Sequence, residues 1–132
     1  MVAIPANVMA LLNAHDVVKV FITAGKNGQP HAIPAGSIAA PAPDTIIIGE
    51  ILTKQSVKNI EENKKAAFLV VKGLEAYEVN VEFKEAVKGG PMLDGMNKAL
   101  AAMHLHASAV LTFAVEAVYN QSANAEAGKK IA

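Results

Sequence analysis

The sequence predicts a mainly β protein in which six antiparallel strands form a sheet that closes on itself, with three short helices in the gaps. Apolar and polar residues alternate from Tyr77 to Phe83, which is the period of a strand with one buried face and one wet face. Hairpin turns join successive strands, and the regular alternation of strands and helices typical of parallel sheets is missing. Of the 132 residues, 52% are hydrophobic, which supplies the core of a single domain (residues 1–132) and excludes a disordered chain.

Each element has its own local signal. Pro5 suits the first turn of a helix, β-branched residues mark the strand that follows, and Asn27-Gly28 favours a hairpin. Pro30 and Pro34 cannot donate ladder hydrogen bonds, so the returning strand is expected to be irregular. The expected elements are a helix at 5–14, strands at 17–23, 29–39 and 45–49, a helix at 53–62, strands at 66–71 and 77–83, a helix at 91–103, a strand at 107–119, and a loose, polar C-terminal tail at 121–132.

Charge and composition exclude several classes of function. Twelve Lys and Arg balance twelve Asp and Glu, whereas general nucleic-acid binders carry a basic excess, so no nucleic acid is expected as a partner. All twelve basic residues are Lys, so the bidentate fork that Arg offers to phosphates is missing. The absence of Cys excludes disulfides and thiol chemistry and fits a reducing compartment. No signal peptide or membrane span is recognisable, so we expect a cytoplasmic protein without a membrane partner.

The most informative segment is the end of the apolar strand at 45–49 and the start of the next helix. Gly49 indicates a close approach of backbone or ligand. A helix start offers unpaired N–H groups and the positive end of a dipole. Thr53 and Ser56 add hydroxyls and Lys54 adds a positive charge, so the segment could hold a phosphate. The alternative is an ordinary helix cap beside a solvated lysine.

Other candidate sites are weaker. His104 and His106 share one face of an extended segment, but no third ligand is fixed nearby, so no metal site is expected. Met92, Met96 and Met103 form a stripe at helical spacing that fits a core or dimer contact. The sequence contains no nucleophile elbow, P-loop or dinucleotide fingerprint, and no catalytic side chain is assigned.

The order of elements resembles a known family. A strand carrying Pro34-Ala35-Gly36-Ser37 is followed by an apolar strand, by Thr53-Lys54-Gln55-Ser56 opening a helix, and by the strands at 66–71 and 77–83. This pattern, from Val8 to Tyr119, resembles the FMN-binding split barrels of the pyridoxamine 5'-phosphate oxidase-like superfamily, in particular its small single-domain FMN-binding proteins. The resemblance implies a six-stranded antiparallel split β-barrel and FMN as the cofactor.

The resemblance also implies where the cofactor lies. The flavin ring is expected along Pro34, Ala35, Gly36 and Ser37. The ribityl phosphate is expected at Ile48 and Gly49 and at the helix start, Thr53, Lys54, Gln55 and Ser56. The family is usually a homodimer with two FMN sites at the interface, and a homodimer is expected here.

The implied function is redox chemistry on FMN, either electron transfer or reduction of a small substrate, with an unidentified electron donor and acceptor. The alternative is a protein that stores or binds flavin, or another small ligand, without turnover. A further alternative is an enzyme related to pyridoxamine 5'-phosphate oxidase. Because the chain lacks Arg and the C-terminal substrate segment of the true oxidases, negligible oxidation of pyridoxamine 5'-phosphate is expected.

Overall fold

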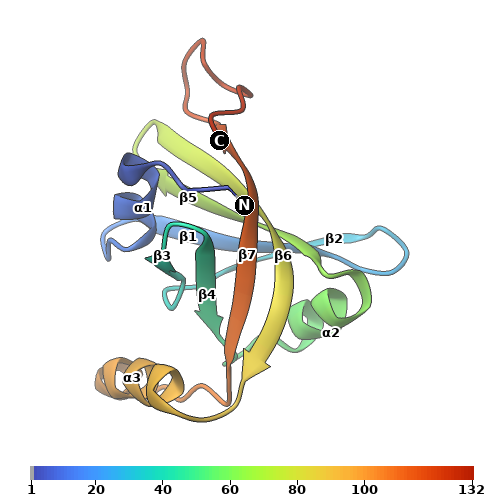
Figure 1. Ribbon diagram of the computed structural model, residues 1–132, viewed down its shortest axis with the longest axis vertical. Coiled ribbons are helices and arrows are strands. Elements are labelled where there is room, and N and C mark those ends of the chain that lie inside the picture. The colour runs from blue at the N-terminus through green and yellow to red at the C-terminus, as the bar shows by residue number, and fades with distance from the viewer. Residues whose placement is uncertain (1) are drawn as a thin grey trace.

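A computed structural model, which describes residues 2–132, shows one antiparallel sheet whose strands curl around a core (Figure 1). The strands are β1 (Val18–Ala24), β2 (Pro30–Pro34), β3 (Ala39–Ala42), β4 (Thr45–Gly49), β5 (Lys65–Lys72), β6 (Glu75–Val87) and β7 (Val110–Asn120). The helices are α1 (Ala6–Leu12), α2 (Lys54–Asn63) and α3 (Pro91–Leu100), the last continued by a 3-10 turn at Ala101–Met103. The strand order is β2-β1-β5-β6-β7-β4-β3.

The sheet differs from the expected six-stranded closed barrel. It has seven strands, and its edge strands β2 and β3 are not hydrogen-bonded to each other. The strand expected at 29–39 is shorter than expected, because β2 ends at Pro34 and residues 35–38 carry the chain across to the opposite edge, where the additional strand β3 begins at Ala39. The Ala35 N–H still donates to the Lys19 carbonyl at 3.0 Å, one residue past Pro34, and the chain then leaves β1.

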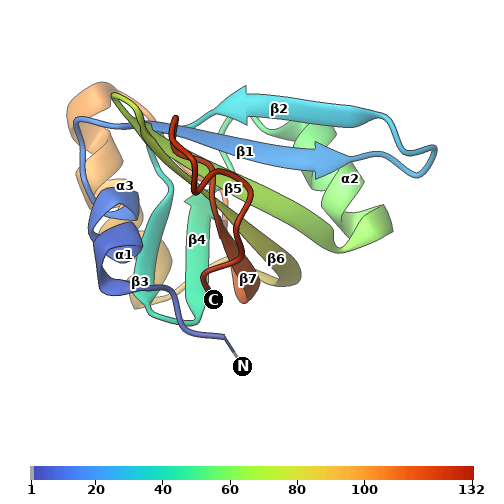
Figure 2. The same ribbon diagram turned by 90° about the horizontal axis from the view of Figure 1, so that it is seen from above.

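Three phenylalanines organise the main core. Phe21 and Phe68 stack with ring centroids 4.9 Å apart, and Phe113 meets both rings edge-on at 5.5 and 5.2 Å. All three come from different strands and are almost completely buried. Val8 and Leu12 of α1 extend this core, so α1 seals one end of the barrel beside β3 (Figure 2).

Helix α3 builds a second, smaller core at the other end of β7. Leu93 and Leu100 pack with Ala107 and Val110, and Met96 lies half-buried against them. The expected methionine stripe is therefore only partly right: Met92 and Met103 are exposed, and Leu93 faces inward in place of Met92. Figure 1 shows α3 at the lower end of the barrel, between the end of β6 and the start of β7.

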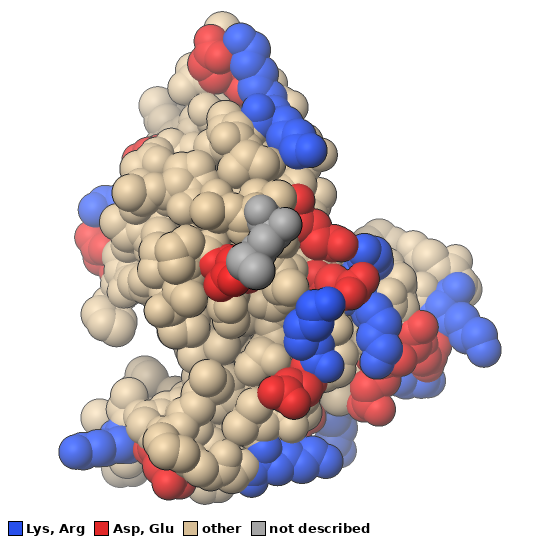
Figure 3. All heavy atoms as spheres, in the orientation of Figure 1, with Lys and Arg blue, Asp and Glu red and all other residues tan. Residues whose placement is uncertain are grey.

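Charge is distributed unevenly over the surface. On the face shown in Figure 3, Lys, Asp and Glu side chains gather most densely over the side formed by β6 and α2. Lys65 of β5 pairs there with Glu82 at 3.2 Å and Glu116 at 2.6 Å, which holds the pKa of Lys65 above its ordinary value. No helix within residues 2–132 is long and apolar enough to cross a membrane.

The C-terminal segment returns to the sheet. Most of residues 121–132 are exposed, as expected of a tail, yet backbone hydrogen bonds join Ile131 and Ala132 to Val118. The Ser122 hydroxyl is buried and bonds both the N–H and the carbonyl of Ala76. These bonds fix the segment against the ends of β6 and β7.

We expect Phe113→Ala to lower the free energy of unfolding by about 3–5 kcal/mol, because it removes the ring that contacts both other core phenylalanines and leaves a cavity. Val18→Ala, at an exposed position of β1, should change it by no more than about 0.5 kcal/mol. Urea denaturation followed by circular dichroism measures both, and similar losses in the two variants would contradict this description of the core.

Candidate functional site

An apolar cavity of about 230 Å³ opens between the end of β2, the loop after β4 and the end of α3. Its lining includes three residues of the segment between β2 and β3 (residues 35–38, called the crossing segment) and Met103 of the 3-10 turn after α3. The lining residues are Ile33, Pro34, Ala35, Gly36, Ser37, Gly49, Ile51, Leu52, Thr53, Leu100, Met103 and Leu105. An apolar cavity with a few polar groups at its edge is the usual form of a site for a planar cofactor or a small ligand.

Large apolar side chains at the rim of this apolar cavity are exposed to solvent. Leu52 is 86% exposed and Met103 is 58% exposed, and Leu105 beside them is also exposed. Three large apolar side chains around one opening form a patch of the kind that proteins cover with a ligand or a partner.

Gly49 lies at the back of the cavity, where the backbone and α3 approach each other closely. A Cβ at this position would come within 2.7 Å of the Met96 sulfur and 3.3 Å of the Ala107 Cβ. The Gly49 N–H also donates to the Ser37 hydroxyl at 3.1 Å, which ties the crossing segment to β4. The sequence predicted a close approach of backbone or ligand at Gly49, whereas the groups that lie closest to it are the side chains of Met96, Ala107 and Ser37.

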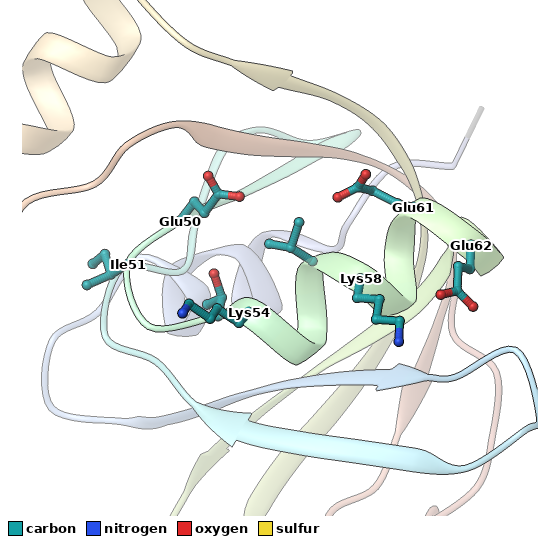
Figure 4. A pocket seen from close by; sticks show the side chains of 8 residues that line it. Glu50, Ile51, Lys54, Lys58, Glu61 and Glu62 are labelled. Atoms are coloured by element: carbon teal, nitrogen blue, oxygen red, sulfur yellow. The ribbon is translucent and has the colours of Figure 1, made fainter.

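A second, polar cavity of about 360 Å³ adjoins the apolar one, with Ile51 and Thr53 lining both. Figure 4 shows its charged side chains: Glu50 comes from the loop before α2, and Lys54, Lys58, Glu61 and Glu62 lie along the helix. Glu61 points to the side of α2 on which Glu50 lies, whereas Lys58 and Glu62 point to the other side.

The start of α2 has polar groups that the protein itself leaves unpaired. Thr53 is the N-cap residue, yet its hydroxyl makes no capping hydrogen bond to the helix. That hydroxyl is buried and has no hydrogen-bond partner within residues 2–132, which is costly for a buried polar group. Lys54 is exposed and forms no ion pair with a carboxylate of residues 2–132, while Glu50 is held by the Ser108 hydroxyl at 2.7 Å. The helix start can therefore receive an anion.

The structure brings most of the sequence-predicted residues together. Pro34, Ala35, Gly36, Ser37, Gly49 and Thr53 line the apolar cavity, and Thr53 and Lys54 line the polar one. The other three lie apart. Ile48 is fully buried in the main core, and the buried Ser56 lines neither cavity. Gln55 lines a third groove, beside the β1–β2 hairpin, and donates to the Asn59 side chain at 2.9 Å.

Solved structures show which fold this is, although no protein-family model and no curated protein matches the sequence. HupZ of Group A Streptococcus superimposes with a TM-score of 0.78 at 24% identity, over 95% of this chain and 99% of that chain. An FMN-binding protein from Syntrophomonas wolfei subsp. wolfei reaches 0.76 at 18% identity, over 88% of this chain and 84% of its own. An F420 reductase reaches 0.68 at 16% identity, over 87% of this chain and 98% of its own.

The chain has the split-barrel fold of the pyridoxamine 5'-phosphate oxidase-like proteins. The resemblance predicted from the order of elements is thereby confirmed. In this split barrel the opening between the unpaired edges β2 and β3 is spanned by residues 35–38, which also line the apolar cavity.

Sequence reasoning missed two parts of the site. The first is the apolar wall of Leu100, Met103 and Leu105, which only the folding of α3 against Gly49 brings to the cavity. The second is Lys19, whose side chain is 7% exposed and donates from Nζ to the Ile38 carbonyl at 2.9 Å. Burial lowers the pKa of Lys19 below the ordinary lysine value of 10.5. Strand alternation, which places Lys19 on the same face as Phe21, was the signal that could have revealed it.

We expect Gly49→Ala to lower the free energy of unfolding by about 1–3 kcal/mol, because its Cβ would overlap the Met96 sulfur. The matched control is Gly36→Ala, whose Cβ would meet nothing within 4 Å, and it should change stability by no more than about 0.5 kcal/mol. In Met96→Ala the obstacle is gone, so the double variant should lose less than the sum of the single losses. Strictly additive losses in chemical denaturation would show that the two side chains do not meet.

We expect the stability of the protein relative to Lys19→Met to rise with pH in the alkaline range. The folded-state pKa of Lys19 is lowered, so between that pKa and 10.5 the unfolded chain binds more protons than the folded one. Raising the pH through this window therefore favours the folded state, whereas the methionine side chain of the variant does not titrate. Denaturation curves for both proteins from pH 7 to pH 10.5 measure the difference, and parallel pH profiles would contradict it.

Proposed function

We propose that this split barrel binds FMN, with the flavin ring in the apolar cavity and the phosphate at the start of α2. One observation carries the proposal: an open apolar cavity shares its edge with a helix start whose buried Thr53 hydroxyl and first-turn N–H groups have no side-chain partner. FMN combines an apolar ring with a phosphate, so it matches both halves. The FMN-binding protein and the F420 reductase of the same fold support a flavin-type ligand.

The residues of this chain have distinct tasks in the proposed site. Backbone groups of residues 34–37 offer hydrogen bonds to the polar edge of the ring, and Leu100 and Leu105 keep water from its apolar part. Thr53 and Lys54 hold the phosphate with the help of the α2 dipole. When bound, the flavin supplies the redox chemistry itself. We therefore propose electron transfer or reduction of a small substrate that needs no proton-donating side chain.

The charge of the polar cavity makes Lys54 the decisive group for the phosphate. Three carboxylates, Glu50, Glu61 and Glu62, line the cavity against two ammonium groups, Lys54 and Lys58. No Arg is available anywhere in the chain to add a second strong phosphate contact. Lys58 points to the side of α2 away from Glu61, which leaves Lys54, next to Thr53, as the cation at the helix start.

A storage or binding role without turnover is the second candidate. The exposed cavity rim is compatible with this role and with redox chemistry on FMN. The visible spectrum of the purified protein separates the flavin proposals from an empty barrel. Stopped-flow mixing of the FMN-loaded protein with a reduced pyridine nucleotide then separates a reductase from a carrier, since only a reductase bleaches the flavin bands rapidly.

We expect Lys54→Ala to weaken FMN binding by about tenfold or more, because a charge-assisted contact with the phosphate is lost. Riboflavin lacks the phosphate, so its affinity should change less than about twofold. Fluorescence titration of both ligands measures the two losses.

Two further lysines provide controls for Lys54→Ala. Lys58→Ala should have a smaller effect, although Lys58 lines the same cavity. Lys98→Ala, on α3 and outside both cavities, should have none. Equal losses for FMN and riboflavin, or a larger loss at Lys58, would show that the phosphate lies elsewhere.

We also propose that two chains associate so that a second copy covers the open side of the apolar cavity. The exposed Leu52, Met103 and Leu105 would then be buried, which is the ordinary fate of such a patch in a homodimer. Leu52→Glu should shift the dimer toward monomer by at least about tenfold in the dissociation constant. Sedimentation equilibrium at micromolar concentration measures this, and a monomeric, flavin-loaded wild-type protein would refute the dimer.

A further inference from the structure

Lys19 has an unusual environment for a lysine. It lies on the inner face of β1, and only 7% of the residue is exposed. Its ammonium group donates to the Ile38 carbonyl at 2.9 Å, and no carboxylate of residues 2–132 lies within ion-pair distance. An unpaired buried charge destabilises a fold. The position of Lys19 next to the crossing segment offers a reason for a lysine at this buried site.

Lys19 holds both ends of the crossing segment, residues 35–38. Its side chain binds the carbonyl of Ile38, and its own backbone carbonyl accepts the N–H of Ala35 at 3.0 Å. Between these two bonds, the Ser37 hydroxyl accepts the N–H of Gly49 at 3.1 Å. Three hydrogen bonds thus fix a four-residue segment that has no ladder partner of its own.

We propose that Lys19 is a positioning residue for the apolar cavity. Lys19 holds residues 35–38 in the shape that receives the ring of a flavin. The inference rests on the proposed function for the identity of the ligand. Ala35, Gly36 and Ser37 line the cavity directly, and Lys19 acts on the ligand only through them. A hydrogen bond from a charged donor is stronger than one between neutral groups, so a buried ammonium group fixes the Ile38 carbonyl more firmly than a neutral side chain would.

The local order of residues 35–38 and the stability of the whole fold can change independently. In Lys19→Met the buried charge is removed together with its hydrogen bond, and replacing a buried charge with an apolar group is often neutral or stabilising. A residue that merely stabilised the fold would affect every slowly exchanging amide equally. A positioning residue affects the amides of the crossing segment while the core amides keep their protection.

The test is amide hydrogen exchange by NMR on wild type, Lys19→Met and the control Lys72→Met, an exposed lysine on β5. In Lys19→Met we expect the amides of Ala35 and Gly49 to exchange at least about tenfold faster, with Val79 of the core unchanged. Riboflavin affinity, measured by fluorescence, should fall by a similar factor. Lys72→Met should change neither. If Lys19→Met does not fold, Lys19→Gln replaces it, because Gln removes the charge at a similar size.

Each outcome decides one question. Unchanged exchange at Ala35 and Gly49 overturns the role of Lys19, and so does faster exchange with unchanged riboflavin affinity. Faster exchange that extends to Val79 assigns Lys19 to the core instead and also overturns it. If the wild type binds neither riboflavin nor FMN, the proposed function fails, and the exchange data still show whether Lys19 orders the segment.

Discussion

The crossing segment at residues 35–38 is the constraint on which both the barrel and the cavity depend. It links β2 to β3, which lie at opposite edges of one sheet, and therefore sets how far the sheet curls around its core. Ile38 at its end is buried in the main core, while Ala35, Gly36 and Ser37 face the apolar cavity. One short piece of chain thus belongs to the core at one end and to the candidate site along its length.

The two halves of the candidate site follow from different physics. The apolar half exists because α3 packs against Gly49 through Met96, which places the turn after α3 opposite the crossing segment. The polar half exists because α2 begins without a side-chain cap, so within residues 2–132 no side chain caps its first N–H groups and the Thr53 hydroxyl has no partner. Their shared edge at Ile51 and Thr53 allows a single ligand to use both.

The local elements could be predicted because each depends on a short stretch of chain. Alternation within β6 and the turn at Gly28, where φ is +87°, needed no tertiary information. The start of α2 was predicted for the same reason. The crossing segment was not, because Pro34 indicates an irregular strand but does not indicate where the chain goes next. Its destination depends on the pairing of β4 with β7, which is distant in sequence.

The residues of the candidate site also divide into those that local sequence could predict and those that depend on distant contacts. Thr53 and Lys54 could be predicted from the helix start, and residues 34–37 came from the resemblance. Ser56 stays a prediction: the rotation of α2 buries it, and its hydroxyl, like that of Thr53, has no hydrogen-bond partner within residues 2–132. That rotation is fixed by Ile60 in the core and by Asn59, which donates to Thr23 at 2.9 Å. Thr23 and the core residues around Ile60 are not adjacent to α2 in sequence.

In the proposed complex a flavin ring occupies the apolar cavity between the crossing segment and the end of α3. Titration of the isotope-labelled protein with riboflavin, followed by amide chemical shifts, tests this most directly. We expect the largest shifts on residues 33–37, 49–53 and 100–105, which line or adjoin the cavity. Shifts confined to the third groove, at Gly25, Asn27 and Gln29 of the β1–β2 hairpin, or no shifts at saturating riboflavin, would contradict it.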